Sequence, residues 1–170
     1  MLQVRQSCFE TNSSSTHAIC IPKGSSAPGN CVFTFRVDRF GWESDEGDAC
    51  DYLYTALCER YGEDPDKLEE VLNHIREVAA KKHNECEFIT PKWSKFSDGT
   101  RYLDFDEGYI DHCSELYPLI DELLNDDDLL MSYIGGASVF TGNDNSDDDR
   151  IDEIISDYES MGYYVYEKGN

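Results

Sequence analysis

The chain has 170 residues and a mass of 19.4 kDa, enough to bury one hydrophobic core, so we expect a single domain over residues 1–170. A composition of 39% hydrophobic and 12% aromatic residues excludes a disordered chain, and no apolar run approaches the ~20 residues of a membrane helix. The net charge of −22, from 14 basic and 36 acidic residues, repels nucleic acid at long range.

The first strands are expected at Leu2–Cys8 and His17–Pro22, where apolar and polar residues alternate. Cys31–Val37 is the clearest strand, because β-branched and aromatic residues alternate along it with a period of two. The register expected to face the core is the apolar one: Cys31, Phe33, Phe35 and Val37.

Two helices are expected next. Ala49–Tyr61 has an acid at or before its first turn, where the helix dipole favours negative charge. Asp64 and Pro65 are typical of an N-cap and a first helical residue, and Lys82 lies where the second helix ends. Apolar residues repeat along this second helix at helical spacing: Leu68, Val71, Leu72, Ile75 and Val78.

The second half of the chain mixes short strands with helices. Because the two kinds of element neither alternate strictly nor segregate, the pattern indicates an α+β fold with a mixed or largely antiparallel sheet and helices packed on it. The expected strands are Cys86–Thr90, Arg101–Phe105, Tyr109–His112, Ala137–Thr141 and Tyr163–Tyr166. The expected helices are Pro118–Leu124, Asp126–Tyr133 and Asp147–Met161, the last stopped by Gly162.

An unusual polar segment runs from Glu10 to His17, between the first two expected strands. Backbone N–H groups and hydroxyls that converge in such a turn suit a phosphate or a developing oxyanion. An ordinary loop is the alternative interpretation. As a site, the segment would use Glu10, Asn12, Ser13, Ser15 and His17 in catalysis, with His17 as general acid or base, and Arg5, Ser14 and Thr16 in substrate binding.

A second candidate cluster combines carboxylates with an imidazole. Asp104 and Asp106 share one side of an expected strand, and Asp111 and His112 lie on opposite sides of the next. Such groups can hold a divalent metal such as Mg²⁺ or act as an acid–base pair. The alternatives are a hydrophilic edge hairpin or a histidine bonded in the core.

The acidic stretch Thr141–Asp149 is similar to a calcium loop but lacks the glycine and the final glutamate that such a loop needs. It is better explained as a strand-to-helix turn whose acids stabilise a helix N-terminus. Asn143 or Asp144 could still point into a site beside the strand end.

Charge is distributed unevenly. Residues 1–42 have a net charge of +2, residues 43–101 of −7 and residues 102–170 of −17. A polyanionic substrate would therefore bind the N-terminal part or bind through a metal ion. The acidity itself fits either solubility or a surface that imitates a polyanion.

Seven cysteines without a Cys-x-x-Cys pair, and no signal-peptide pattern, lead us to expect free thiols in the cytoplasm.

The run Arg5–His17 (R-Q-S-C-F-E-T-N-S-S-S-T-H) resembles the N-terminus of a group of small phage and bacterial proteins, most of which have no assigned function. This resemblance implies an origin in a phage or mobile element, the cytosol of a bacterial host, and a relation to anti-CRISPR proteins that inactivate Cas9 by cutting its guide RNA. Cys113 departs from the pattern, in which a polar residue is expected. Later segments are also similar: Phe40–Glu43, Tyr52–Ala56, Tyr109–His112 and Val139–Asn145.

The sequence thus leads to two main functional hypotheses, with an enzyme that acts on nucleotides or proteins, such as a transferase, as a third interpretation. The first is a ribonuclease that acts on guide RNA or on the Cas9–guide RNA complex, in which Asp111, His112 and Asp144 complete the site around His17, directly or through a divalent metal. The second is a non-enzymatic inhibitor whose acidic surface over residues 102–170 occupies a basic groove on a host or CRISPR protein.

Overall fold

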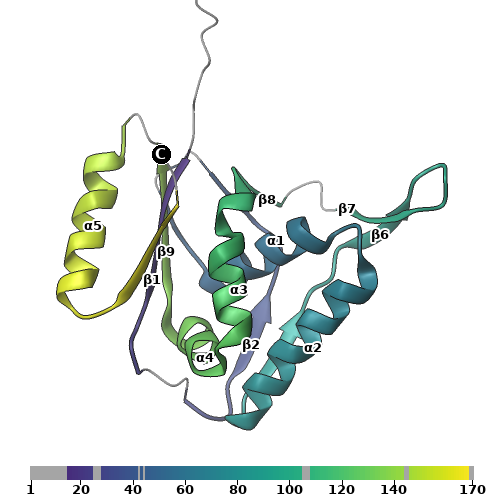
Figure 1. The fold of residues 1–170 in the computed structure, drawn as a ribbon, viewed down its shortest axis with the longest axis horizontal. Coiled ribbons are helices and arrows are strands. Elements are labelled where there is room, and N and C mark those ends of the chain that lie inside the picture. Colours follow the sequence, from purple (N-terminus) through teal and green to yellow (C-terminus); the bar gives the residue numbers. More distant parts are fainter. Residues whose placement is uncertain are drawn as a thin grey trace, which may run out of the picture.

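The main sheet of the computed structural model has four antiparallel strands in the order β10–β1–β9–β4 (Figure 1). The structure describes residues 15–24, 28–41, 43, 45–104, 108–143 and 146–168, so the strand expected at 2–8 lies outside the described residues. The strands of this sheet are β1 (Ser15–Ile21), β4 (Asp45–Gly47), β9 (Ser138–Asn143) and β10 (Tyr164–Lys168).

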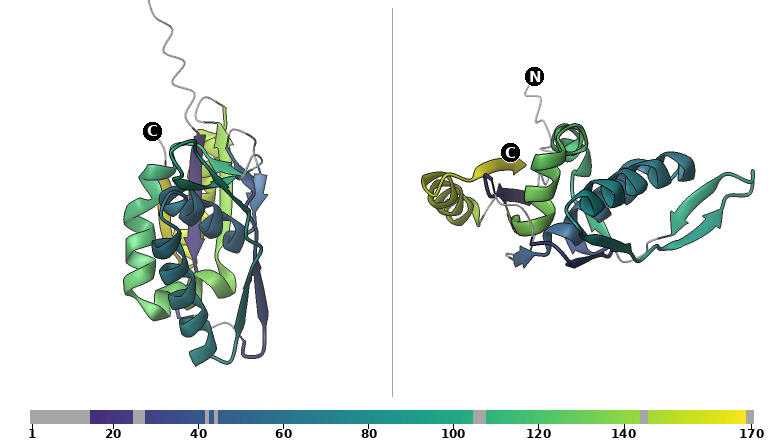
Figure 2. Two further views of the ribbon diagram at one scale, coloured as in Figure 1. Left: turned by 90° about the vertical axis from the view of Figure 1, so that its right-hand side faces the viewer. Right: turned by 90° about the horizontal axis from the view of Figure 1, so that it is seen from below.

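Helices pack on this antiparallel sheet, which makes the fold α+β as predicted. They cover both of its faces (Figures 1 and 2). One face carries α5 alone, and the other faces α1, α3 and α4, with α2 packed outside α1. Successive side chains of β1 point to opposite faces of the sheet. Ile19 and Ile21 therefore join the main core, while Ala18 and Cys20 pack in a smaller cluster under α5. The helices are α1 (Ala49–Tyr61), α2 (Pro65–Lys81), the 3-10 helix η1 (Cys113–Leu116), α3 (Tyr117–Asn125), α4 (Asp127–Gly136) and α5 (Asp148–Ser160).

The two helices expected in the first half of the chain are confirmed. Asp48 caps α1 by accepting hydrogen bonds from the backbone N–H groups of Cys50 and Asp51, and Asp64 caps α2, in which Pro65 is the first residue. Residues on every side of α1 are buried, because it lies between the sheet and the other helices: Ala49, Cys50, Tyr52, Leu53, Tyr54, Thr55, Ala56, Leu57 and Cys58.

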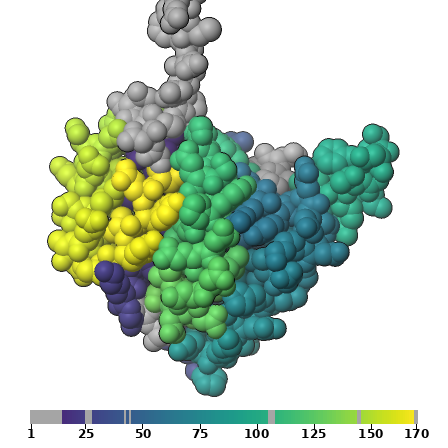
Figure 3. Space-filling model, in the orientation of Figure 1, coloured from purple at the N-terminus to yellow at the C-terminus, as the bar shows by residue number. Residues whose placement is uncertain are grey.

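Three short strand pairs surround the helices: β2 (Val32–Phe35) pairs parallel with β5 (Glu85–Phe88), β3 (Arg39–Phe40) parallel with β8 (Tyr109–Ile110), and β6 (Lys92–Lys95) antiparallel with β7 (Arg101–Asp104). The apolar register predicted for the β2 segment is confirmed, since Phe35 is buried and Val32 is 60% exposed. The β6–β7 hairpin projects from the body of the molecule (Figure 3).

Two expectations about strands are corrected. Strands β3, β4 and β6 were not expected. The first two have only two and three residues, and the Lys-Trp-Ser-Lys sequence of β6 has no β-branched residue and is held in the hairpin by its pairing with β7. The strand expected over Tyr109–His112 ends at Ile110. His112 has a φ of 52°, in the left-handed region, and it begins the turn into η1. Asp111 and His112 therefore do not occupy opposite faces of a strand.

The main core is built mostly from α1 to α4 and one face of the sheet. In the part of the chain that the structure describes, no helix combines the length and the apolar character needed to cross a membrane.

Candidate active site

A row of polar side chains crosses one end of the main sheet. His17 on β1 lies directly opposite Lys168 on β10 and Thr141 on β9, and Thr141 lies opposite Asp45 on β4. Opposed residues of an antiparallel pair project to the same face of a sheet, so these four residues, here called the polar row, share a face. This face is the one that α1, α3 and α4 cover, since His17 contacts Tyr52 of α1.

The same face of the sheet is apolar two residues further along. There Ile19 lies opposite Val139 and Tyr166, and these side chains belong to or pack against the main core. His17 is fully buried and Lys168 is 1% exposed, although polar side chains in such a place cost free energy unless they are bonded. A chain selected for stability alone would continue the apolar pattern, so this end of the sheet is where we place the candidate site.

His17 is held by one bond and leaves one ring nitrogen without a partner. Its Nδ1 lies 2.7 Å from the Tyr52 hydroxyl, and its Nε2 is buried without a hydrogen-bond partner among the described residues. Burial, and in second place the nearby charge of Lys168, lowers the pKa of His17 to about 2. The imidazole is therefore neutral at pH 7 and can accept or donate a hydrogen bond at Nε2.

Lys168 contacts the residue that begins β1. Its Nζ donates to Ser15 Oγ at 3.0 Å and approaches the Ser15 carbonyl oxygen at 3.4 Å, while the Ser15 N–H donates to Asp111 Oδ2 at 3.2 Å. Burial lowers the pKa of Lys168, and nearby acids, among them Glu115, Asp111 and Glu59, oppose that shift. The first and last described strands thus meet at a buried amine and a buried hydroxyl.

Half-buried Glu59 and buried Cys113 lie near this contact. The carboxylate of Glu59 on α1 accepts a hydrogen bond from the Ile110 N–H, and burial raises the pKa of Glu59. Cys113 approaches the Ala56 carbonyl oxygen with its sulfur at 3.9 Å, and burial raises the pKa of its thiol. Cys113 is therefore an uncharged thiol packed against α1, and it serves poorly as a nucleophile.

The structure brings together three of the residues expected in the site: Ser15, His17 and Asp111. Thr16 projects to the opposite face of β1, by strand alternation. His112 is half exposed and lies beside Asp111 and Glu115.

The other expected residues divide into two groups. Asn143 is opposite Ser15, and its N–H donates to Asp147 at the start of α5, as a strand-to-helix turn requires. Asp104 belongs to the β6–β7 hairpin, where it accepts a hydrogen bond from Ser94. The remaining expected residues lie outside the described residues: Arg5, Glu10, Asn12, Ser13, Ser14, Asp106 and Asp144.

Five residues of the site were missed by the sequence analysis: Asp45, Tyr52, Glu59, Thr141 and Lys168. The last could have been found, because Tyr164, Tyr166 and Lys168 follow the two-residue period of a strand and place a lysine on a buried face. Tyr52 and Glu59 gave no such signal, since on a helix they follow the ordinary apolar and polar pattern.

The magnesium site expected as one option remains a prediction. Within residues 15–143 and 146–168, as far as the structure describes them, no group of three or more His, Cys, Asp or Glu side chains is placed to hold a metal ion.

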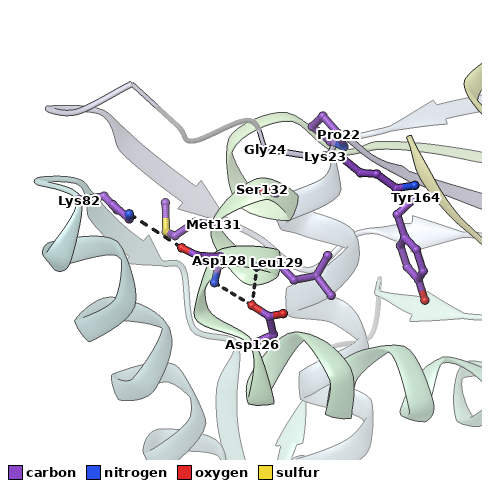
Figure 4. A pocket seen from close by; sticks show the side chains of 10 residues that line it. All are labelled: Pro22, Lys23, Gly24, Lys82, Asp126, Asp128, Leu129, Met131, Ser132 and Tyr164. Carbon is purple, nitrogen blue, oxygen red and sulfur yellow. Dashed lines mark hydrogen bonds and ion pairs between the residues drawn. The ribbon is translucent and has the colours of Figure 1, made fainter. Parts of the chain in front are cut away.

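Two cavities lie at opposite ends of β1. The first, about 330 Å³, is between the end of β1, the start of α4 and β10 (Figure 4). Three of its charged side chains bond within the cavity, Lys82 to Asp128 at 3.9 Å and Asp126 to the first N–H groups of α4. The second, about 400 Å³, adjoins the polar row, because Thr141 and Asp45 line it.

Comparison of the chain with protein-family models, with curated proteins and with solved structures finds no significant match in any of the three.

Proposed function

We propose that this chain is an enzyme that cleaves phosphodiester bonds in RNA, with the polar row and Ser15 as its active site. The observation that carries the proposal is a neutral imidazole beside a buried amine on the neighbouring strand. His17 offers an Nε2 that bonds no other described residue, and Lys168 offers positive charge. Cleavage of RNA by its own 2′-hydroxyl needs a proton acceptor and a positive charge for the phosphate oxygens.

In this reaction the 2′-oxygen attacks phosphorus, and the bond from phosphorus to the 5′-oxygen breaks. Nε2 of His17 accepts the 2′-hydroxyl proton, and the imidazolium then returns a proton to the departing 5′-oxygen. Lys168 donates hydrogen bonds to the non-bridging phosphate oxygens. The role of His17 requires the tautomer in which Nδ1 donates to the Tyr52 oxygen, 2.7 Å away.

The low pKa of His17 has a consequence for this mechanism. A group with a pKa of about 2 is a weak base in the protein alone. A phosphate placed beside Nε2 raises that pKa, because negative charge favours the protonated ring. It also offsets the positive charge of Lys168, the second cause of the depression. Binding of substrate would thus prepare the base.

The proposed substrate is a guide RNA, free or bound to Cas9, in the cytosol of a bacterial host. The support is the resemblance of the N-terminal run Arg5–His17 to that group of phage and bacterial proteins, because this run includes Ser15 and His17 at the start of β1. In this proposal Arg5 and the amides of residues 12–14 hold a phosphate next to the one that reacts. The reaction through the 2′-hydroxyl does not require Mg²⁺, although a metal could assist in binding the polyanion.

The test is incubation of the purified protein with end-labelled guide RNA, with and without Cas9, in Mg²⁺ or in EDTA. We expect cleavage by the unaltered protein and none by His17→Gln. His74→Gln, on α2, is the matched control and should cleave normally. Products ending in a 2′,3′-cyclic phosphate would identify the 2′-hydroxyl as nucleophile. Absence of cleavage under all four conditions contradicts the proposal.

A second candidate, direct inhibition by an acidic surface, is favoured by α5. This helix buries Ile151 against the sheet and presents six exposed acids to solvent, a row of charge that a basic groove could bind. If this function holds, the protein blocks nucleic-acid binding by its partner without cutting RNA, and neutralising the helix weakens the block. The acids are Asp148, Asp149, Asp152, Glu153, Asp157 and Glu159.

A further inference from the structure

We propose that the cavity beside the polar row binds a guanine base of the RNA, next to the phosphate that reacts. The proposal deepens the proposed function and rests on it, because it assigns the base that accompanies the cleaved bond. The cavity is formed by six residues from β3, β4, β8, β9 and the segment between β3 and β4: Arg39, Gly41, Glu43, Asp45, Tyr109 and Thr141.

The cavity has the size and the position that such a role needs. Its volume is about 400 Å³, within the range of small-molecule sites. It shares Thr141 and Asp45 with the polar row, and Thr141 is directly opposite His17 in the sheet. Neighbouring strands are about 4.8 Å apart. The cavity therefore lies one strand away from His17 and two strands away from Lys168.

One wall of the cavity is an aromatic ring. Tyr109 is 45% exposed, and the Arg39 guanidinium lies 5.7 Å from the centre of its ring. Gly41 keeps the ring edge open, since a Cβ at this position would lie 3.3 Å from the Tyr109 hydroxyl. Unpaired bases in RNA complexes stack on such rings and on guanidinium planes.

The opposite wall supplies hydrogen-bond acceptors. The backbone carbonyl of Glu43 accepts a bond from Thr141 Oγ1 at 2.9 Å, which fixes Glu43 beside β9. Asp45 Oδ1 accepts from the Glu46 N–H at 2.8 Å, so the Glu43 carboxylate is the more available of the two acids. An ionised carboxylate only accepts hydrogen bonds.

This wall selects one base. Guanine presents two adjacent donors on its Watson–Crick edge, N1–H and the 2-amino group, which a single carboxylate can accept together. Adenine, cytosine and uracil each place an acceptor beside their donor on that edge, and an acceptor opposite Glu43 is repelled. Arg39 has donors that match the O6 and N7 atoms of guanine.

Charge also favours a base over a phosphate in this cavity. Its lining carries two acids and one arginine, so a phosphate is disfavoured there and a neutral base is not. The phosphate is attracted instead to Lys168, at the other end of the polar row.

The test uses 2′-O-methyl trinucleotides U-X-U, which lack the attacking hydroxyl, with X as each of the four bases. Binding is measured by calorimetry without turnover. We expect U-G-U to bind at least tenfold more tightly than the other three. Tyr109→Ala should weaken U-G-U binding at least fivefold and Tyr109→Phe should not. Phe96→Ala, at a 48% exposed aromatic residue in the β6–β7 hairpin, is the matched control.

A second variant addresses the base itself. Glu43→Gln replaces one acceptor by a donor and should reduce the preference for U-G-U at least fivefold while leaving the melting temperature unchanged. Equal binding of all four trinucleotides, or loss of affinity in none of these variants, overturns the guanine site. If U-G-U binds selectively and RNA is not cleaved, the site stands and the proposed function falls. If RNA is cleaved with dependence on His17 but without base selectivity in binding, the reverse holds.

Discussion

Replacement of Lys168 by methionine separates a functional role from a structural one. Lys168 is 1% exposed, and no described carboxylate lies within 4.0 Å of its ammonium group. Its hydrogen bonds go to Ser15 instead. A charge buried without an ion pair is costly, and methionine fills nearly the same volume with flexible apolar atoms.

The expected change in stability can be worked from these contacts. Replacement of buried charge by apolar groups of similar volume ranges from neutral to stabilising by about 1–4 kcal/mol. The Ser15 hydroxyl loses its partner in the variant, which costs about 1–3 kcal/mol. The net effect therefore lies between about 3 kcal/mol of destabilisation and about 3 kcal/mol of stabilisation, and the melting temperature moves by no more than about 12 °C in either direction.

Activity should fall much further than this change in stability explains. Loss of the positive charge at the phosphate should slow RNA cleavage about 10²- to 10³-fold, as loss of one oxyanion donor does in other enzymes. Calorimetry and a cleavage assay on Lys168→Met measure both quantities, with exposed Lys95→Met as control. A variant that is about 2 kcal/mol less stable and cleaves RNA at the normal rate refutes this assignment of Lys168.

Three further predictions concern other parts of the fold. Because the pKa of His17 falls from 6.5 to about 2 on folding, the unfolded chain binds a proton below pH 6.5 that the native protein does not. The free energy of unfolding should therefore decrease by up to about 1.4 kcal/mol for each unit by which the pH is lowered. In urea unfolding between pH 6 and pH 4, His17→Gln should show a shallower decrease. Gly142→Ala should destabilise the protein by about 1–3 kcal/mol in thermal unfolding, because the added Cβ would lie 2.7 Å from Asp147 Cβ. Substitution of Asp148, Asp149 and Asp152 by asparagine should leave the rate of RNA cleavage within about twofold of normal, but should weaken inhibition of the partner protein if α5 binds it. Asp147 is left unchanged because it accepts a hydrogen bond from the Asn143 N–H.

Local signals in the sequence predicted most of the fold. Asp64 was predicted as the N-cap of α2 and an acid was expected near the start of α1, because short acidic side chains are favoured at helix N-termini. The alternation around Phe35 gave the correct face of β2. The end of β8 could not be predicted, because the left-handed backbone of His112 depends on how the chain enters η1. Strand β6 depends on its partner in the same way.

The sequence analysis predicted part of the site. Ser15 and His17 were expected from their polar segment, and Asp111, which bonds the Ser15 N–H, from a separate segment. Lys168 and Tyr52, their other partners, were not expected. Lys168 is 153 residues from Ser15, and Tyr52 is 35 residues from His17. A single sequence shows no relation between such positions, because pairing between β1 and β10 is decided by the packing of the whole sheet.

The separation between Ser15 and Lys168 has a consequence for folding kinetics. Their contact forms only when β1 pairs with β10, the pairing of longest range in the main sheet. Contacts of such range require closure of a very long loop and tend to form late. In a refolding experiment, helix signals from α1 and α2 should therefore recover before the amine and the hydroxyl meet. Partly folded intermediates with near-native helix content would lack this contact.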